Sequence, residues 1–320
     1  MTASLPLVWI LLVLVAAGWL AAFLAVRLSL SLCDDGRYEP AARVRRVFLV
    51  ALLPWIVPLA FLGAALMPAA GKAFGLIADH CLSHGASHPH LCLEHLPVIA
   101  LTHWHWLVMG LLMAWLAYRV SRHVASERRM GFRLQTMAAL ARGGGRMRIL
   151  DMDECAAFAI HPGQPLILMS RGLIERLSLR ERRVVLAHEV AHLRHRDPAG
   201  SRLLDRLLLL HERTAAVRLR RAWQQAIEER SDEAVAKRFG AEEVAATIVK
   251  VARVVSGRDT PVLSAAGADT VRRIERLLAE RRPPAGSDRY EIAYGAALLM
   301  VVVVVAASHH WLETLLGTLA

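Results

Sequence analysis

Residues 178–195 read SLRERRVVLAHEVAHLRH, and this stretch decides how the rest of the chain is interpreted. Ser178 and Glu181 have the spacing of a capping box, in which a serine caps the start of a helix and a glutamate reaches back to it. This spacing predicts a helix that begins at Leu179 and that Pro198 helps to end. Its middle, VVLAHEVAHL, is apolar on nearly every side, which indicates that the helix is buried.

Two histidines and a glutamate interrupt the apolar middle of this helix. His188 and His192 are four residues apart, so their side chains lie on the same face. Two imidazoles on adjacent turns can bind one zinc ion at Zn–N distances of about 2.0–2.1 Å. Glu189 is then placed to remove a proton from zinc-bound water. The alternative is a pair of core histidines with an ion-paired glutamate. Either arrangement gives the polar groups the partners that burial demands, and we favour the zinc site.

A second charged segment can complete such a site. A catalytic zinc needs a third protein ligand and an open position for water. Residues 226–238, AIEERSDEAVAKR, predict a helix on which Glu228 and Asp232 share a face. We expect Glu228 to bind the metal and Asp232 to hydrogen-bond the outer nitrogen of a ligand histidine. The alternative for Glu228 is an ordinary surface charge. Glu229 and Glu233 point about 100° away, and we expect them to face solvent.

Long apolar blocks dominate the sequence outside these two segments. The chain has 320 residues, of which 55% are hydrophobic, and its mean hydropathy is +0.38. Soluble domains are about 45–50% apolar, and about 20 apolar residues are enough to cross a bilayer. We therefore predict four transmembrane helices, at about residues 5–30, 47–67, 97–118 and 292–307.

Many of the arginines behind the net charge of +11 flank these apolar blocks. Basic residues mark the cytoplasmic side of membrane segments. We find no RNA-binding signature and expect no direct nucleic-acid binding. The rule places the N-terminus and residues 68–96 outside, and residues 31–46 and 119–290 inside. The supporting residues are Arg37, Arg43, Arg45 and Arg46 before the second span, Arg119, Arg122, Arg128 and Arg129 after the third, and Arg281, Arg282 and Arg289 before the fourth, against Lys72 alone between the second and third.

The predicted outside loop carries two cysteines and several histidines. Cys81 and Cys92 lie where a disulfide can persist, whereas Cys33 and Cys155 lie inside and are expected to be reduced. The histidines have two interpretations, which are a metal or proton sensor and a polar loop that happens to be rich in histidine. They are His80, His84, His88, His90 and His95.

These observations predict an α+β fold, mostly helical, with a small β-sheet. Residues 1–120 form a three-span membrane region, 121–288 a cytoplasmic zinc-binding domain, and 289–320 a fourth transmembrane helix with a short outside tail. The cytoplasmic segment is long enough for a core of its own. Its candidate strands are Met147–Leu150, Ala156–Ile160 and Leu166–Met169.

The histidine helix and its surroundings resemble a known family. Residues 165–198, from PLILMSRGLIERL to LRHRDP, are similar to the core of the BlaR/MecR-type antirepressor metallopeptidases, which are gluzincins of the bacterial inner membrane. Residues 228–235, EERSDEAV, resemble the third-ligand segment of that family. The order of three spans, a zinc domain and a fourth span is also similar. Related HtpX-like and CAAX-type membrane proteases share both motifs.

The resemblance implies a Zn²⁺-dependent endopeptidase with a zincin-like domain that faces the cytoplasm of a bacterium from its inner membrane. His188, His192 and Glu228 would be the zinc ligands and Glu189 the catalytic base. The implied partners are membrane lipid and a protein substrate, such as a transcriptional repressor. About a dozen residues follow the fourth span, so we expect no penicillin-binding sensor domain. Two alternatives stay open, which are an HtpX-like quality-control protease and a non-catalytic zinc-binding signal transducer.

Three further positions complete the expectations. Residues 164–170 resemble the family's edge strand beside the active site, where a substrate peptide would pair; the alternative is a plain core strand. Arg273 resembles a basic residue that stabilises an oxyanion or a carboxylate, although we favour a surface position. Asp197 either supports the site from behind or caps a turn. The expected substrate-binding residues are Leu166, Ile167 and Leu168.

Overall fold

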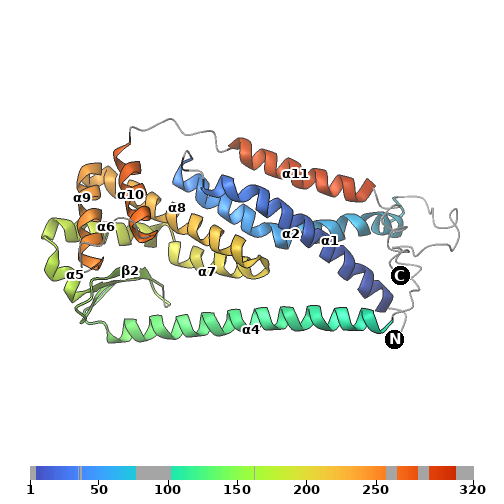
Figure 1. Ribbon diagram of the computed structural model, residues 1–320, viewed down its shortest axis with the longest axis horizontal. Helices are drawn as coiled ribbons and strands as arrows, with labels where there is room; N and C mark the ends of the chain where they lie inside the picture. The colour runs from blue at the N-terminus through green and yellow to red at the C-terminus, as the bar shows by residue number, and fades with distance from the viewer. Residues whose placement is uncertain are drawn as a thin grey trace.

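The computed structural model describes residues 5–34, 36, 38–76, 102–161, 163–256, 265–279 and 288–307. The molecule is elongated, with a bundle of long helices at one end and a small sheet covered by shorter helices at the other (Figure 1). This arrangement confirms the predicted mostly helical α+β class. The elements are α1 (Leu5–Asp34), α2 (Pro40–Ala73), α4 (His103–Leu140), β1 (Met147–Leu150), β2 (Ala157–Ile160), β3 (Leu166–Ser170), α5 (Arg171–Arg176), α6 (Leu179–Arg194), α7 (Asp197–Leu207), the 3₁₀ helix η1 (Leu208–Leu210), α8 (Arg213–Phe239), α9 (Ala241–Ser256), α10 (Ala265–Leu278) and α11 (Asp288–Ala307).

Two of the described helices are long and apolar enough to cross a membrane. They cover Leu7–Cys33 in α1 and Pro40–Met67 in α2, judged by length and composition. The other two expected spans coincide with helices, since α4 begins at His103 and α11 covers 292–307, but neither is a candidate span within the described residues. Residues 97–101 lie outside the described part of the chain. Two membrane helices are therefore supported, not four.

The two candidate spans pack closely against each other. Gly18 of α1 faces α2, and a Cβ atom at this position would lie 2.6 Å from the Cα of Pro58. Real Cβ atoms do not approach a backbone atom so closely, so glycine permits this crossing. Tyr294 of α11 donates a hydrogen bond to the carbonyl of Leu49 at 2.7 Å, which ties the last helix to α2.

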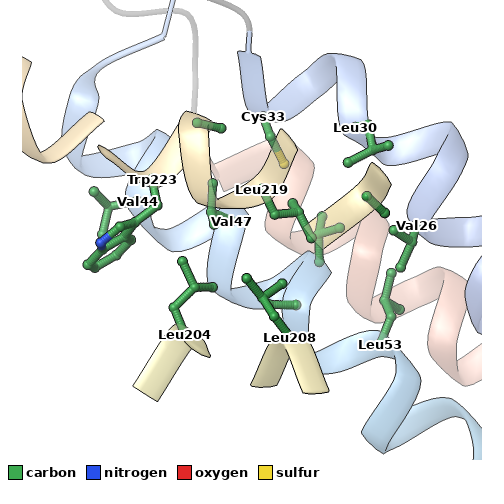
Figure 2. Packing of buried hydrophobic residues seen from close by; sticks show 14 of the residues in the cluster. Val26, Leu30, Cys33, Val44, Val47, Leu53, Leu204, Leu208, Leu219 and Trp223 are labelled. Carbon is green, nitrogen blue, oxygen red and sulfur yellow. The ribbon is translucent and has the colours of Figure 1, made fainter. Parts of the chain in front are cut away.

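A single apolar core joins this hairpin to the mixed part of the molecule. Buried residues of α1 and α2 meet buried residues of α7, η1 and α8 in one cluster (Figure 2). The indole of Trp223 stacks edge-on against Phe48 at a centroid distance of 4.8 Å. Gly200 makes room for that indole, because a Cβ atom there would lie 2.8 Å from it. The labelled members are Val26, Leu30 and Cys33 of α1, Val44, Val47 and Leu53 of α2, and Leu204, Leu208, Leu219 and Trp223 opposite them.

The sheet has three strands in the order β1-β3-β2. Strand β3 lies in the centre, parallel to β1 and antiparallel to β2. All five residues of β3 are buried, so this strand reads as a continuous apolar run. The strand positions agree with the prediction, but the predicted edge strand is wrong, because both backbone edges of β3 are already paired.

Helix α6 begins as its sequence predicts. The hydroxyl of Ser178 accepts the backbone N–H of Glu181, and the carboxylate of Glu181 accepts the N–H of Ser178 at 2.7 Å. This capping box fixes where the helix starts, and hence which face carries its histidines. Within the described part of the chain, neither Cys33 nor Cys155 forms a disulfide. The predicted disulfide between Cys81 and Cys92 and the histidine-rich loop lie outside the described residues.

Candidate active site

Two helices bring a possible metal-binding triad together. His188 and His192 come from consecutive turns of α6, and Glu228 comes from α8. One ligand atom of each lies within 4.8 Å of the others. The Nε2 atoms of the two histidines are 2.9 Å apart, and Glu228 approaches them at 3.2 Å and 3.5 Å. Three donor atoms therefore converge on one point.

The outer nitrogen of each histidine is held by its own buried carboxylate. Nδ1 of His188 lies 3.0 Å from Asp232, and Nδ1 of His192 lies 2.8 Å from Asp197. Both aspartates are almost fully buried, and Arg230 binds the second oxygen of Asp197. Such carboxylates fix the ring orientation and raise the basicity of a metal-binding imidazole. Asp197 thus supports the site from behind, which was one of its two expected roles.

The charged groups of the cluster strongly shift one another's pKa values. Burial lowers the pKa of both histidines, but hydrogen bonds from the neighbouring carboxylates outweigh it and raise the pKa of His188 to about 10 and that of His192 to about 9. Burial also opposes ionisation of Glu228, yet the two histidines and Arg273 hold its pKa well below the usual value. These shifts favour protonated imidazole beside an ionised carboxylate in the metal-free site. A metal cation would replace those protons.

Glu189 lies beside the triad, with 8% of its surface exposed. Burial raises the pKa of Glu189, although the nearby histidines and a hydrogen bond from the backbone N–H of Ala159 oppose this shift. A carboxylate with a raised pKa is a stronger base, and it can both accept a proton and return it. The structure thus places a base next to the point where a metal-bound water would sit.

Two residues occupy places that the sequence reading did not favour. Arg273 of α10 contacts Asp232 at 2.7 Å and Glu228 at 3.1 Å, so the favoured surface position is wrong. Glu229 is 2% exposed and pairs with Arg43, so its predicted solvent exposure is wrong. Helix α8 packs against α2, α6 and α10 at once, so several of its faces are buried. Glu233 retains substantial exposure, as expected.

A cavity of about 1030 Å³ opens beside the histidines. Charged groups of the site form one part of its lining. Apolar side chains form most of the rest, chiefly from α9 and α10. They include Val244, Ile248 and Val251 of α9, and Ile274 of α10.

Strand β2 forms the backbone wall of this cavity. Ala156 and Ser170 bond to each other across β2 and β3, and the strands are antiparallel from there. Because strand residues alternate in direction, Ala157 and Ala159 direct their backbone groups away from β3. The N–H of Ala159 indeed reaches Glu189. The strand edge that borders the cavity is therefore that of β2, whereas Leu166, Ile167 and Leu168 lie on β3, whose two edges are paired within the sheet.

Most of these residues fall within one segment of the chain. Residues 134–258 match the model of Peptidase family M48. The matched segment runs from the last turns of α4 to just past α9, so it contains His188, Glu189, His192 and Glu228 but not Arg273. Peptidases of this family are metal-dependent, and the match supports a metallopeptidase. No curated protein and no solved structure matches the chain.

The donor set fits zinc. Two imidazole nitrogens and one carboxylate oxygen are typical protein ligands of a catalytic zinc, and they leave a position for water. Each imidazole also has the outer carboxylate partner that such sites use. His188, His192 and Glu228 would hold the ion.

Proposed function

We propose that this chain is a membrane-embedded zinc endopeptidase that cleaves a cytoplasmic or membrane-associated regulatory protein. The observation that carries the proposal is the convergence of His188, His192 and Glu228 beside the buried Glu189. Zinc, when bound, supplies a Lewis acid and lowers the pKa of its water ligand to about 7. A structural zinc site would have no use for a base in this position.

The chain's own residues divide the remaining work. Glu189 accepts the proton of the attacking water and delivers it to the leaving amine. Asp232 and Asp197 keep the two histidines oriented. Ala157 and Ala159 offer backbone groups that align an extended peptide, and the apolar wall of α9 receives a side chain of that peptide. The chemistry of this wall favours apolar residues next to the scissile bond.

The resemblance to BlaR/MecR-type proteins supports a dedicated regulatory substrate and a multi-pass protein of the bacterial inner membrane. In this topology the candidate spans in α1 and α2 cross the membrane and the segment that matches family M48 faces the cytoplasm. The basic residues around the apolar blocks support the orientation. The large apolar cavity favours a second candidate, an HtpX-like quality-control protease, because backbone pairing and apolar contacts accept many sequences.

The decisive variant is Glu189→Gln, which keeps the shape of the side chain but removes the base. We expect the full chain in detergent to retain zinc, measured by metal analysis. Hydrolysis of a quenched fluorescent peptide library should fall by about 10²–10⁴-fold. A variant as active as the wild type would remove Glu189 from the mechanism. Zinc binding by a wild type that hydrolyses no peptide would instead favour a non-catalytic transducer.

The same variant separates the two protease roles. Proteins that accumulate with Glu189→Gln in cells, compared with the wild type, can be identified by mass spectrometry. One or two regulators would support a dedicated switch. A broad set of membrane proteins would support quality control.

A further inference from the structure

An arginine of the second candidate membrane helix reaches into the core of the M48 domain. Arg43, in the first turns of α2, binds Glu229 of α8 at 2.6 Å. The side chain of Arg43 is 0% exposed and that of Glu229 is 1% exposed. A charge in such a place is tolerated only with a partner, because burial removes its hydration. The pair therefore fixes how α2 and α8 meet.

Glu229 directly follows the candidate ligand Glu228, and it collects charges from a second helix. Arg272 and Arg276 of α10 approach it at 3.1 Å and 3.4 Å. Between them, Arg273 contacts Glu228 itself. Ion pairs from both α2 and α10 therefore hold the same turn of α8. A displacement of Glu229 would carry the neighbouring carboxylate away from the histidines.

The connection between α1 and α2 joins this network. Arg276 donates hydrogen bonds to the carbonyls of Gly36 at 2.8 Å and Tyr38 at 3.3 Å. Helix α10 therefore touches the short link between the two candidate spans as well as the turn that holds Glu228. The membrane hairpin and the metal site share one set of ion pairs.

We propose that Arg43 is a positioning residue for the metal site, acting through Glu229 to hold Glu228 in place for metal binding. This inference rests on the proposed zinc-dependent function. On this inference, α2 helps to position a metal ligand in addition to anchoring the protein. A signal that shifts α2 would reach the metal ligand through this pair.

The test compares Arg43→Gln with Arg46→Gln in the full chain. Arg46 lies on the same helix and is equally buried, but its guanidinium sits over the ring of Tyr38 at 3.5 Å. Both variants are made in the Glu189→Gln background, so that zinc retention is read without turnover. The probe is zinc alone, and the measurement is its rate of loss to a chromogenic chelator. We expect about tenfold faster loss or more for Arg43→Gln, and a rate near that of the parent for Arg46→Gln.

A third variant guards against misfolding. In Arg43→Gln/Glu229→Gln the buried ion pair becomes a pair of neutral side chains, while Arg272 keeps Gln225 and Arg276 keeps Glu233 as partners, so this protein should fold even if the single variant does not. We expect it also to lose zinc about tenfold faster, because two neutral side chains hold the turn less firmly. If the double variant and Arg46→Gln both retain zinc like the parent, the inference is wrong while the proposed function stands. A parent protein that binds no zinc would overturn the proposed function itself.

Discussion

Each candidate ligand histidine contacts a different aspartate through its outer nitrogen, and the contact of His192 with Asp197 leads to a prediction. Replacing Asp197 with Asn leaves the shape of the side chain but removes the charge that orients His192 across 2.8 Å. We expect zinc affinity to fall by about 10–100-fold. Competition with a fluorescent chelator measures it. The matched control is Asp205→Asn, whose side chain is 40% exposed and pairs with Arg220. Equal losses in both variants would contradict the role of Asp197.

The histidines also predict how stability depends on pH when zinc is removed. Burial lowers the pKa of both groups, but their carboxylate partners raise them to about 10 for His188 and about 9 for His192, from 6.5. The protonated rings therefore stabilise the folded protein below about pH 6.5, and this contribution is lost as pH rises through 9 to 10. We expect the melting temperature of the metal-free protein to fall across that window.

Zinc should change this profile. Because the ion competes with protons for the same nitrogens, its apparent affinity should rise from pH 7 to pH 9. The zinc-loaded protein should lose less stability over the same range. A metal-free protein whose melting temperature is flat from pH 6.5 to 10 would argue against cationic histidines in the folded state.

At this scale the sequence could predict the residues that lie on one helix. The spacing of His188, His192, Glu228 and Asp232 identifies shared faces without any tertiary information. The environments of Asp197, Glu229 and Arg273 depend on which helices pack together. No local pattern shows that α8 is surrounded by several neighbouring helices. For the same reason, the sequence predicts solvent-exposed positions for Glu229 and Arg273.

Among the elements, strand β2 makes the sharpest prediction. Ala157→Pro removes an N–H that points away from β3, so the sheet should stay paired while one bond to the substrate is lost. We expect kcat/KM for a peptide substrate to fall by about tenfold, in line with one hydrogen bond of about 1.4 kcal/mol. Zinc content should not change. Ala157→Val keeps the N–H and is the control. Unchanged kcat/KM in the proline variant would remove β2 as the docking strand.

The strand positions were predictable, but their order was not. Short apolar runs between turn residues locate Met147–Leu150, 156–160 and 166–169 along the chain. Which strand lies in the centre depends on long-range pairing, which no single run specifies. The bulky apolar run LILM at 166–169 was the available signal, because a strand buried on both faces reads as a continuous apolar run.

At the scale of the whole molecule, α1 and α2 share one buried core with α7 and α8, so we expect these helices to unfold together. Trp223→Ala removes the indole that packs on Phe48 and fills the space above Gly200. We expect the free energy of unfolding in detergent to fall by about 3–5 kcal/mol. Chemical denaturation followed by fluorescence measures this loss. Trp104→Ala is the control, since that side chain is 73% exposed. A loss of similar size in the control would mean that burial in this core is not the cause.

Hydropathy predicts a membrane region and a separate domain after it, and the boundaries at 120 and 288 remain predictions. It could not show that α1 and α2 share a core with α7 and α8. Apolar residues that face lipid and those that face protein look alike in a sequence. The exposed apolar residues of α4 illustrate the same ambiguity.

The pairing of Arg43 with Glu229 has a consequence for biosynthesis. The two residues are 186 positions apart, so the ribosome makes the arginine first. At about 5–20 residues per second, the glutamate follows roughly 10–40 s later. On the proposed topology, the nascent hairpin is inserted while its arginine still carries an unmatched charge that holds this end in the cytoplasm. On that topology, one guanidinium first helps to orient the hairpin and later completes the contact between α2 and α8.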